Sequence, residues 1–216
     1  RLNHINLRKE QEDLAAYLSS REKKARLPEW VEETYAKPGV RIRVVVMRLS
    51  DIQDLHSNNT EEAIAFEMET IKTIVEQTLR ELGNVLVLPV DREFIAAILF
   101  SEESVAEGRV TVASQHILEV TGELIHICMD VGISEEKDET EGFAELNLMY
   151  QMARAATAYR FIYGMGAVVT EGEMAQRALN GEQAPSSEEL IQRLRQSDRT
   201  GFSAEYRRIV GELKKL

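Results

Sequence analysis

Apolar and polar positions along the chain follow two different periods, and the changes of period outline strands and helices. Residues 41–49 (RIRVVVMRL) are rich in β-branched side chains, which predicts a strand that is apolar on both faces, as a central strand would be. Apolar residues then recur every three or four positions from Ile64 to Leu82, which is typical of one face of a helix. Gly83 is expected to end this helix in a left-handed cap.

Further along the chain, the pattern predicts a hairpin, two helices and two more strands. In chain order these are a hairpin of 85–88 and 94–100, a helix over 110–121 ended by Gly122, a strand over 124–134, an acidic loop over 135–142, a helix over 143–163 and a strand over 167–170. The order β-α-β-β-α-β-α-β contains the split βαβ arrangement of ferredoxin-like folds. We therefore predict an α+β fold, an antiparallel sheet with helices on one face.

Two helical segments flank this predicted sheet. Residues 1–37 are read as a helical stalk, in which Leu7, Leu14 and Leu18 form a thin stripe that fits either a short coiled coil with a second copy or a solvated connector. Residues 38–170 form the main domain, and residues 171–216 form a C-terminal helical hairpin that acts as a connector. The residues predicted to build the core are Val44, Val46, Ile64, Met68, Ile71, Val75, Val87, Ile98, Ile127, Met129 and Met152.

Composition narrows the classes of function. The chain has 216 residues and a net charge of −11, which argues against direct binding of nucleic acid because phosphate binding is mostly driven by cations. Its single cysteine, Cys128, excludes an internal disulfide and is read as a buried small hydrophobe. No apolar stretch approaches the roughly 18 residues that span a bilayer. Because the sequence shows no secretory signal, we expect a cytoplasmic chain. Because the chain begins with Arg1 and not with Met, we expect a fragment of a longer protein.

A search for catalytic motifs finds little. The histidines His4, His56, His116 and His126 are scattered without metal-ligand spacing, and His126 is read as a packed or edge residue of a strand. No phosphate-binding loop, dinucleotide fingerprint or nucleophile elbow is present in the sequence. The sequence therefore predicts no catalytic residue, no metal and no cofactor.

The hairpin carries a family resemblance. Residues 88–96 (LPVDREFIA) are similar to the segment around the signature of GGDEF domains, which have a nucleotidyl-cyclase-like fold. On this resemblance the signature positions are Val90, Asp91, Arg92, Glu93 and Phe94. Residues 127–134 (ICMDVGIS) resemble the strand that follows in the family, and the likeness covers about residues 40–169.

The departures from the family pattern imply a degenerate site. Val90 and Asp91 stand where active members have two glycines, and Arg92 and Arg48 stand where they have metal-binding acids. Two arginines would repel magnesium, which prefers anionic oxygen ligands. Residues 81–84 (ELGN) replace the motif that binds the product as an inhibitor. The resemblance therefore leads us to expect that the chain is not an enzyme.

Residues 159–169 narrow the resemblance to the degenerate GGDEF-like domain of AraC-type bacterial transcription regulators. This implies a homodimeric, non-catalytic signal-relay segment between an upstream sensor, which can anchor the parent protein to a membrane, and a downstream helix-turn-helix domain absent from this chain. The alternative is a regulatory module that binds a nucleotide or metabolite, with Arg48 and Arg92 as anion contacts instead of surface ion-pair partners. The input signal and the target genes do not follow from the sequence.

Overall fold

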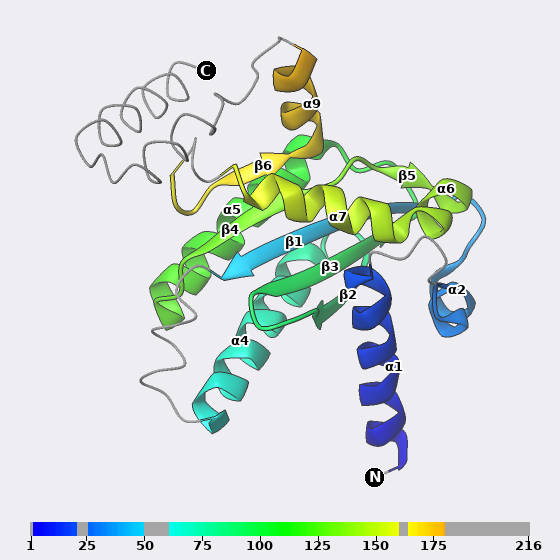
Figure 1. The fold of residues 1–216 in the computed structure, drawn as a ribbon, viewed down its shortest axis with the longest axis horizontal. Helices are drawn as coiled ribbons and strands as arrows, with labels where there is room; N and C mark the ends of the chain where they lie inside the picture. The colour runs from blue at the N-terminus through cyan, green and yellow to red at the C-terminus, as the bar shows by residue number, and fades with distance from the viewer. Residues whose placement is uncertain (1, 21–25, 50–60, 160–163, 180–216) are drawn as a thin grey trace, which may run out of the picture.

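The fold was obtained as a computed structural model that describes residues 2–20, 26–49, 61–159 and 164–179 (Figure 1). The described helices are α1 (Leu2–Ser19), α2 (Glu29–Tyr35), α4 (Glu61–Leu79), α5 (Glu107–Ile125), α6 (Glu139–Ala144), α7 (Leu146–Thr157) and α9 (Glu171–Leu179). The described strands are β1 (Arg41–Leu49), β2 (Asn84–Pro89), β3 (Phe94–Ser101), β4 (Met129–Ile133), β5 (Lys137–Asp138) and β6 (Val168–Thr170).

The strands form one mixed sheet in the order β2-β3-β1-β4-β6, and the short β5 also pairs with β1. β1 is central and runs antiparallel to both β3 and β4, whereas β4 and β6 are parallel. The predicted α+β class is confirmed, and the predicted antiparallel sheet is mostly antiparallel, with the β4–β6 pair as the parallel part. The split βαβ order also holds, because β2 and β3 form a hairpin beside β1.

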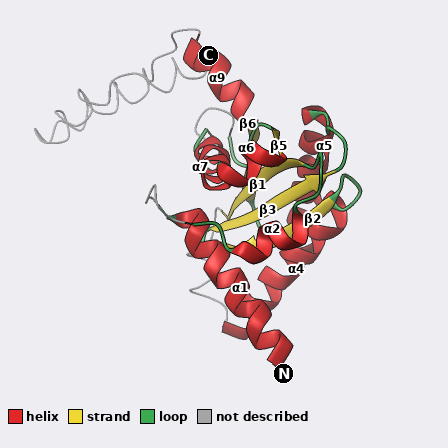
Figure 2. Cartoon of the chain, turned by 90° about the vertical axis from the view of Figure 1, so that its right-hand side faces the viewer, coloured by secondary structure: helices red, strands yellow, loops and turns green. Residues whose placement is uncertain are grey.

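Helices cover both faces of the sheet, which corrects the prediction that they lie on one face. Figure 2 shows the strands between α7 on one side and α5 on the other. The cause is visible in β1, where Val44 and Val46 join the core beneath α7 while Val45 and Met47 join the core beneath α4 and α5. A strand that is apolar on both faces needs a covering layer on each of them.

The N-terminal segment packs against the same domain. Leu14 and Leu18 of α1 are fully buried, and Tyr17 is nearly so. These side chains belong to the core cluster on the α7 face, so Leu14 and Leu18 of the stripe that suggested a coiled coil pack within the chain. Tyr35 of α2 stacks on Phe100 of β3 with ring centroids 4.3 Å apart.

The boundary between α5 and β4 differs from the sequence prediction. Gly122 lies inside α5, which continues to Ile125 and ends at His126 in a left-handed conformation with φ 54°. His126 is therefore an exposed helix cap and not a strand residue. Cys128 is half-buried, not buried. The strand starts only at Met129, because the helix takes up the first apolar residues of the predicted strand.

Two further boundaries were wrong. Gly83 does not have a positive φ; a Cβ there would lie 2.5 Å from the Phe100 carbonyl oxygen, so this glycine permits a close approach of two chain segments. The expected acidic loop contains β5 and α6, and α6 begins where the Asp138 carboxylate accepts a hydrogen bond from the Glu141 N–H at 3.0 Å. Residues 180–216, which include most of the predicted C-terminal connector, lie outside the described residues.

The predicted core is largely correct. Val44, Val46, Ile71, Val75, Val87, Ile98, Ile127 and Met129 are buried. Ile64, Met68 and Met152 are only half-buried. Among the residues placed by the structure, no helix is long and apolar enough to cross a membrane.

Candidate functional site

The hairpin between β2 and β3 ends in a turn that is shaped by one carboxylate. Asp91 Oδ1 accepts hydrogen bonds from the backbone N–H groups of Glu93, at 2.7 Å, and Phe94, at 2.9 Å. The Val90 N–H donates to the Phe94 carbonyl at 2.9 Å and closes the turn. The Asp91 carboxylate thus forms hydrogen bonds with the backbone of its own turn, as aspartate side chains often do.

Arg48 lies beside this turn, at the end of β1. In the sheet register it stands directly opposite Phe94 on one side and Asp130 on the other, so the three side chains share the face covered by α7. Arg48 Nη2 lies 3.9 Å from Glu93 Oε2, and its guanidinium lies 5.9 Å from the centre of the Phe94 ring. Because Glu93 is more than half exposed, this ion pair contributes under about 1 kcal/mol.

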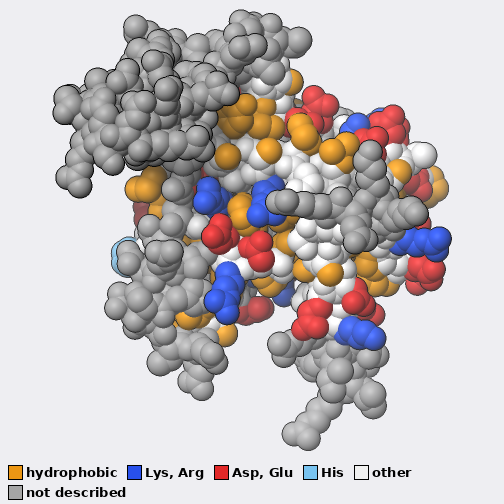
Figure 3. Space-filling view, in the orientation of Figure 1, with side chains coloured by type: hydrophobic (Ala, Val, Ile, Leu, Met, Phe, Trp, Pro, Cys, Tyr) orange, Lys and Arg blue, Asp and Glu red, His pale blue; other side chains and the backbone are white. Residues whose placement is uncertain are grey.

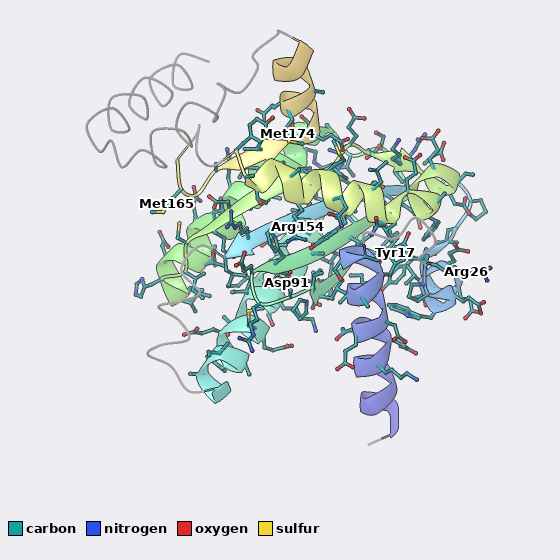
Figure 4. The ribbon with its side chains drawn as sticks, viewed as in Figure 1. Tyr17, Arg26, Asp91, Arg154, Met165 and Met174 are labelled. Atoms are coloured by element: carbon teal, nitrogen blue, oxygen red, sulfur yellow. The ribbon has the colours of Figure 1, made fainter. Side chains whose placement is uncertain are left out.

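A second arginine reaches the same ring from α7. The Arg154 guanidinium lies 4.3 Å from the centre of the Phe94 ring, within the range of a cation–π contact. Figure 4 shows Arg154 projecting from α7 toward the sheet, above Asp91 at the tip of the hairpin. The contact therefore joins α7 to the signature hairpin.

Tyr150 and Asp130 complete the surroundings of the two arginines. Burial raises the pKa of Tyr150 to about 12; the Arg154 charge opposes this rise and the Asp91 charge adds to it. Asp130 is buried and accepts a hydrogen bond from the Gly166 N–H at 3.0 Å, which fixes the turn before β6. Asp130 therefore supports the backbone on this side of the sheet.

The structure gathers some of the predicted site residues and leaves others apart. Arg48, Glu93 and Phe94 come together, whereas Arg92 is exposed on the turn. Across the described ranges, no group of three or more acidic, histidine or cysteine side chains could hold a metal ion. The positive and negative side chains on this face are intermixed (Figure 3), and no described feature favours the alternative of a regulatory ligand held by Arg48 and Arg92.

Sequence reasoning missed Arg154, Tyr150 and Asp130. The first two are four positions apart on α7, and this spacing places them on one face of a helix. The sequence did contain an indication of Arg154, which is a charged residue on an otherwise apolar face of the predicted helix. Nothing in the sequence paired Asp130 with the distant Gly166.

Comparisons with known proteins give likenesses of structure only. No family model matches the chain, and no curated protein matches it either. Solved structures that resemble it include the active GGEEF domain of a diguanylate cyclase from Vibrio cholerae, with 10% identity, a TM-score of 0.45 and coverage of 61% of this chain and 83% of that one.

Two other solved structures are similar to the same degree. The GGDEF domain of DgcB from Caulobacter crescentus, solved in complex with c-di-GMP, has 13% identity and a TM-score of 0.46, covering 77% of this chain and 90% of that one. An EAL/GGDEF domain protein from M. capsulatus has 10% identity and a TM-score of 0.46, covering 66% of this chain and 92% of that one.

These neighbours correct one prediction. The expectation that the chain is not an enzyme is contradicted, because the solved structures that resemble it are GGDEF or GGEEF domain proteins and one of them is the active GGEEF domain of a diguanylate cyclase. We do not retain that expectation. The chain is similar in fold to GGDEF domains.

Proposed function

We propose that the chain is a GGDEF-like signal-relay and dimerisation segment of a bacterial AraC-type transcription regulator, working in the cytoplasm. The observation that carries this proposal is that one helix, α7, contacts both the N-terminal helix α1 and the C-terminal helix α9. A relay needs an element whose position both its input and its output can influence. The AraC-type context rests on the sequence resemblance of residues 159–169.

The output side of α7 is closely tied to the core. Met174 of α9 packs with Ala156 of α7 and Val169 of β6 in a small buried cluster. Thr170 and Glu173 form a reciprocal capping box at the start of α9, with hydrogen bonds of 2.9 and 3.2 Å. The Glu135 N–H donates to the Glu171 carboxylate at 2.9 Å, so a movement of the sheet end would be passed to α9.

A reporter experiment tests the relay. The chain is joined through its C-terminus to the helix-turn-helix pair of an AraC-type regulator, and transcription from the cognate promoter is measured. Met174→Ala should change the output several-fold, because it removes a contact between α7 and α9. Met165→Ala is the matched control, since Met165 is 70% exposed whereas Met174 is 8% exposed (Figure 4). Equal output from both variants would contradict the relay.

Dimerisation is tested separately on the isolated chain. Sedimentation velocity over a range of concentrations should show a species of twice the chain mass of 24.5 kDa. A monomer throughout that range would remove the dimerisation part of the proposal and leave the relay to the reporter experiment.

A further inference from the structure

The C-terminal end of α1 is held by two side-chain amides of α7. Asn147 Nδ2 lies 2.8 Å from the Tyr17 carbonyl oxygen, 2.9 Å from that of Leu18 and 3.1 Å from that of Ser20. Gln151 Nε2 donates to the Leu18 carbonyl at 2.9 Å. The last carbonyls of a helix have no partner within the helix, so these amides satisfy groups that would otherwise need water. We call Asn147 and Gln151 the amide clasp.

The apolar side of α1 covers the flank of the signature hairpin. Leu14, Tyr17 and Leu18 are in one buried cluster with Leu88 and Phe94 of the hairpin strands, and Val90 packs against that cluster. Figure 1 shows α1 extending away from the domain from the point where its end meets α7 and β2. These contacts hold the C-terminal end of α1, so a force that pulls on α1 would act on the hydrogen bonds of the amide clasp.

The amide clasp and the hairpin are joined along one side of α7. Arg154 is seven positions, about two turns, after Asn147, so the two side chains project from nearby directions. Arg154 contacts the Phe94 ring, and Asn147 contacts the end of α1. A shift of α7 where Asn147 contacts α1 would therefore also change the contact between Arg154 and Phe94.

We propose that the amide clasp is the release point of α1: α1 alternates between a docked state and an undocked state, and undocking exposes the hairpin flank and loosens the Phe94–Arg154 contact. This inference rests on the proposed relay function and names how the signal is received. The four amide-to-carbonyl contacts are only partly buried, so water can replace them when α1 leaves. The apolar contacts of α1 then favour its return.

Hydrogen exchange of the whole chain, followed by mass spectrometry, tests the clasp. The double variant Asn147→Asp and Gln151→Glu replaces both donors with carboxylates that repel the helix carbonyls. Exchange of amides in residues 10–19 and 88–94 should become at least roughly tenfold faster, because unmade hydrogen bonds at a docked end favour local opening. Gln115→Glu on an exposed part of α5 makes the same chemical change elsewhere and should leave both regions at wild-type rates.

Amides of β1 serve as an internal reference for the folded state. If β1 also exchanges faster in the double variant, the two single variants are measured, since each retains one donor. Wild-type exchange of residues 10–19 in variants with an intact β1 would overturn the clasp. Faster exchange of α1 without any change in residues 88–94 would overturn the coupling to the hairpin. If both regions respond while the reporter is unaffected by Met174→Ala, the clasp stands and the relay fails.

Discussion

Asp91 illustrates how a single residue can replace a backbone device. On the family resemblance it stands in the place of a glycine, whose use is to allow unusual backbone conformations. Among the described residues the only non-glycine position with a positive φ is His126, so the turn at Asp91 is built from ordinary conformations. Two backbone N–H groups bonded to its carboxylate hold the turn instead. The hairpin therefore keeps its shape through a side chain.

We predict that Tyr150 makes the free energy of unfolding depend on pH in the alkaline range. Its side chain is fully buried, and burial raises its pKa to about 12 from 10.0. Between pH 10 and 12 the unfolded chain would lose this proton while the folded chain keeps it, so the free energy of unfolding falls as pH rises through that window. Tyr150→Phe should remove this part of the alkaline loss, and at neutral pH it should change stability by less than about 1 kcal/mol.

Denaturant unfolding of both proteins across this pH range checks the prediction. The other tyrosines are the same in both proteins and cancel in the difference. A gap between wild type and variant that stays constant from neutral to strongly alkaline pH would show that Tyr150 ionises normally in the folded state.

At the scale of elements, the contact between α7 and β4 is unusually close. A Cβ at Gly132 of β4 would collide with the Ala153 carbonyl oxygen and would lie 3.0 Å from the Ala156 Cβ. The small side chains on that side of α7 and the glycine beneath them let the helix backbone lie directly on the strand. This packing fixes the height of α7 above the sheet, and thereby the reach of Arg154 to Phe94.

We predict that Gly132→Ala destabilises the fold by roughly 1–3 kcal/mol, because an inserted methyl group must push α7 away from β4. Gly122→Ala is the matched control, since the space around Gly122 is open and it lies within α5. That substitution should stabilise the fold by about 0.5–1 kcal/mol, because alanine favours the helix more than glycine does. Chemical denaturation measures both, and equal losses of stability in the two variants would refute the close contact.

Elements with a single clear period were predictable, and their ends were less so. The apolar run of β1 and the three-four spacing of α4 were assigned correctly because local residues determine them. The end of α5 was misplaced because Leu124 and Ile125 suit a strand equally well, and the helix is separated from β4 by three residues that begin with the left-handed His126.

The same distinction applies to the candidate site. The hairpin was found because its residues are adjacent in sequence. Arg154 was not, because its partner Phe94 lies on another element and only the folded chain brings the two together.

At the scale of the whole molecule, the net charge of −11 disfavours binding of nucleic acid. We predict that this chain does not bind duplex DNA, because phosphate binding requires an uncompensated cluster of cations on one face. Positive and negative side chains are mixed on the face seen in Figure 3. A mobility-shift experiment with duplex DNA at low salt should show no complex. Salt-sensitive binding at micromolar concentration or below would contradict the prediction and would make part of this chain a DNA contact.

The contact between α1 and α7 also constrains the order in which the chain can fold. Asn147 and Tyr17 are 130 residues apart in sequence, and Gln151 and Leu18 are 133 apart. At a synthesis rate of roughly 5–20 residues per second, roughly 6 to 26 seconds pass between the emergence of α1 from the ribosome and that of its partner α7. Until then Leu14 and Leu18 lack the part of their buried surroundings that α7 supplies. Helix α1 is therefore made well before its packing is complete, and a chaperone that binds exposed apolar segments would have access to it during synthesis.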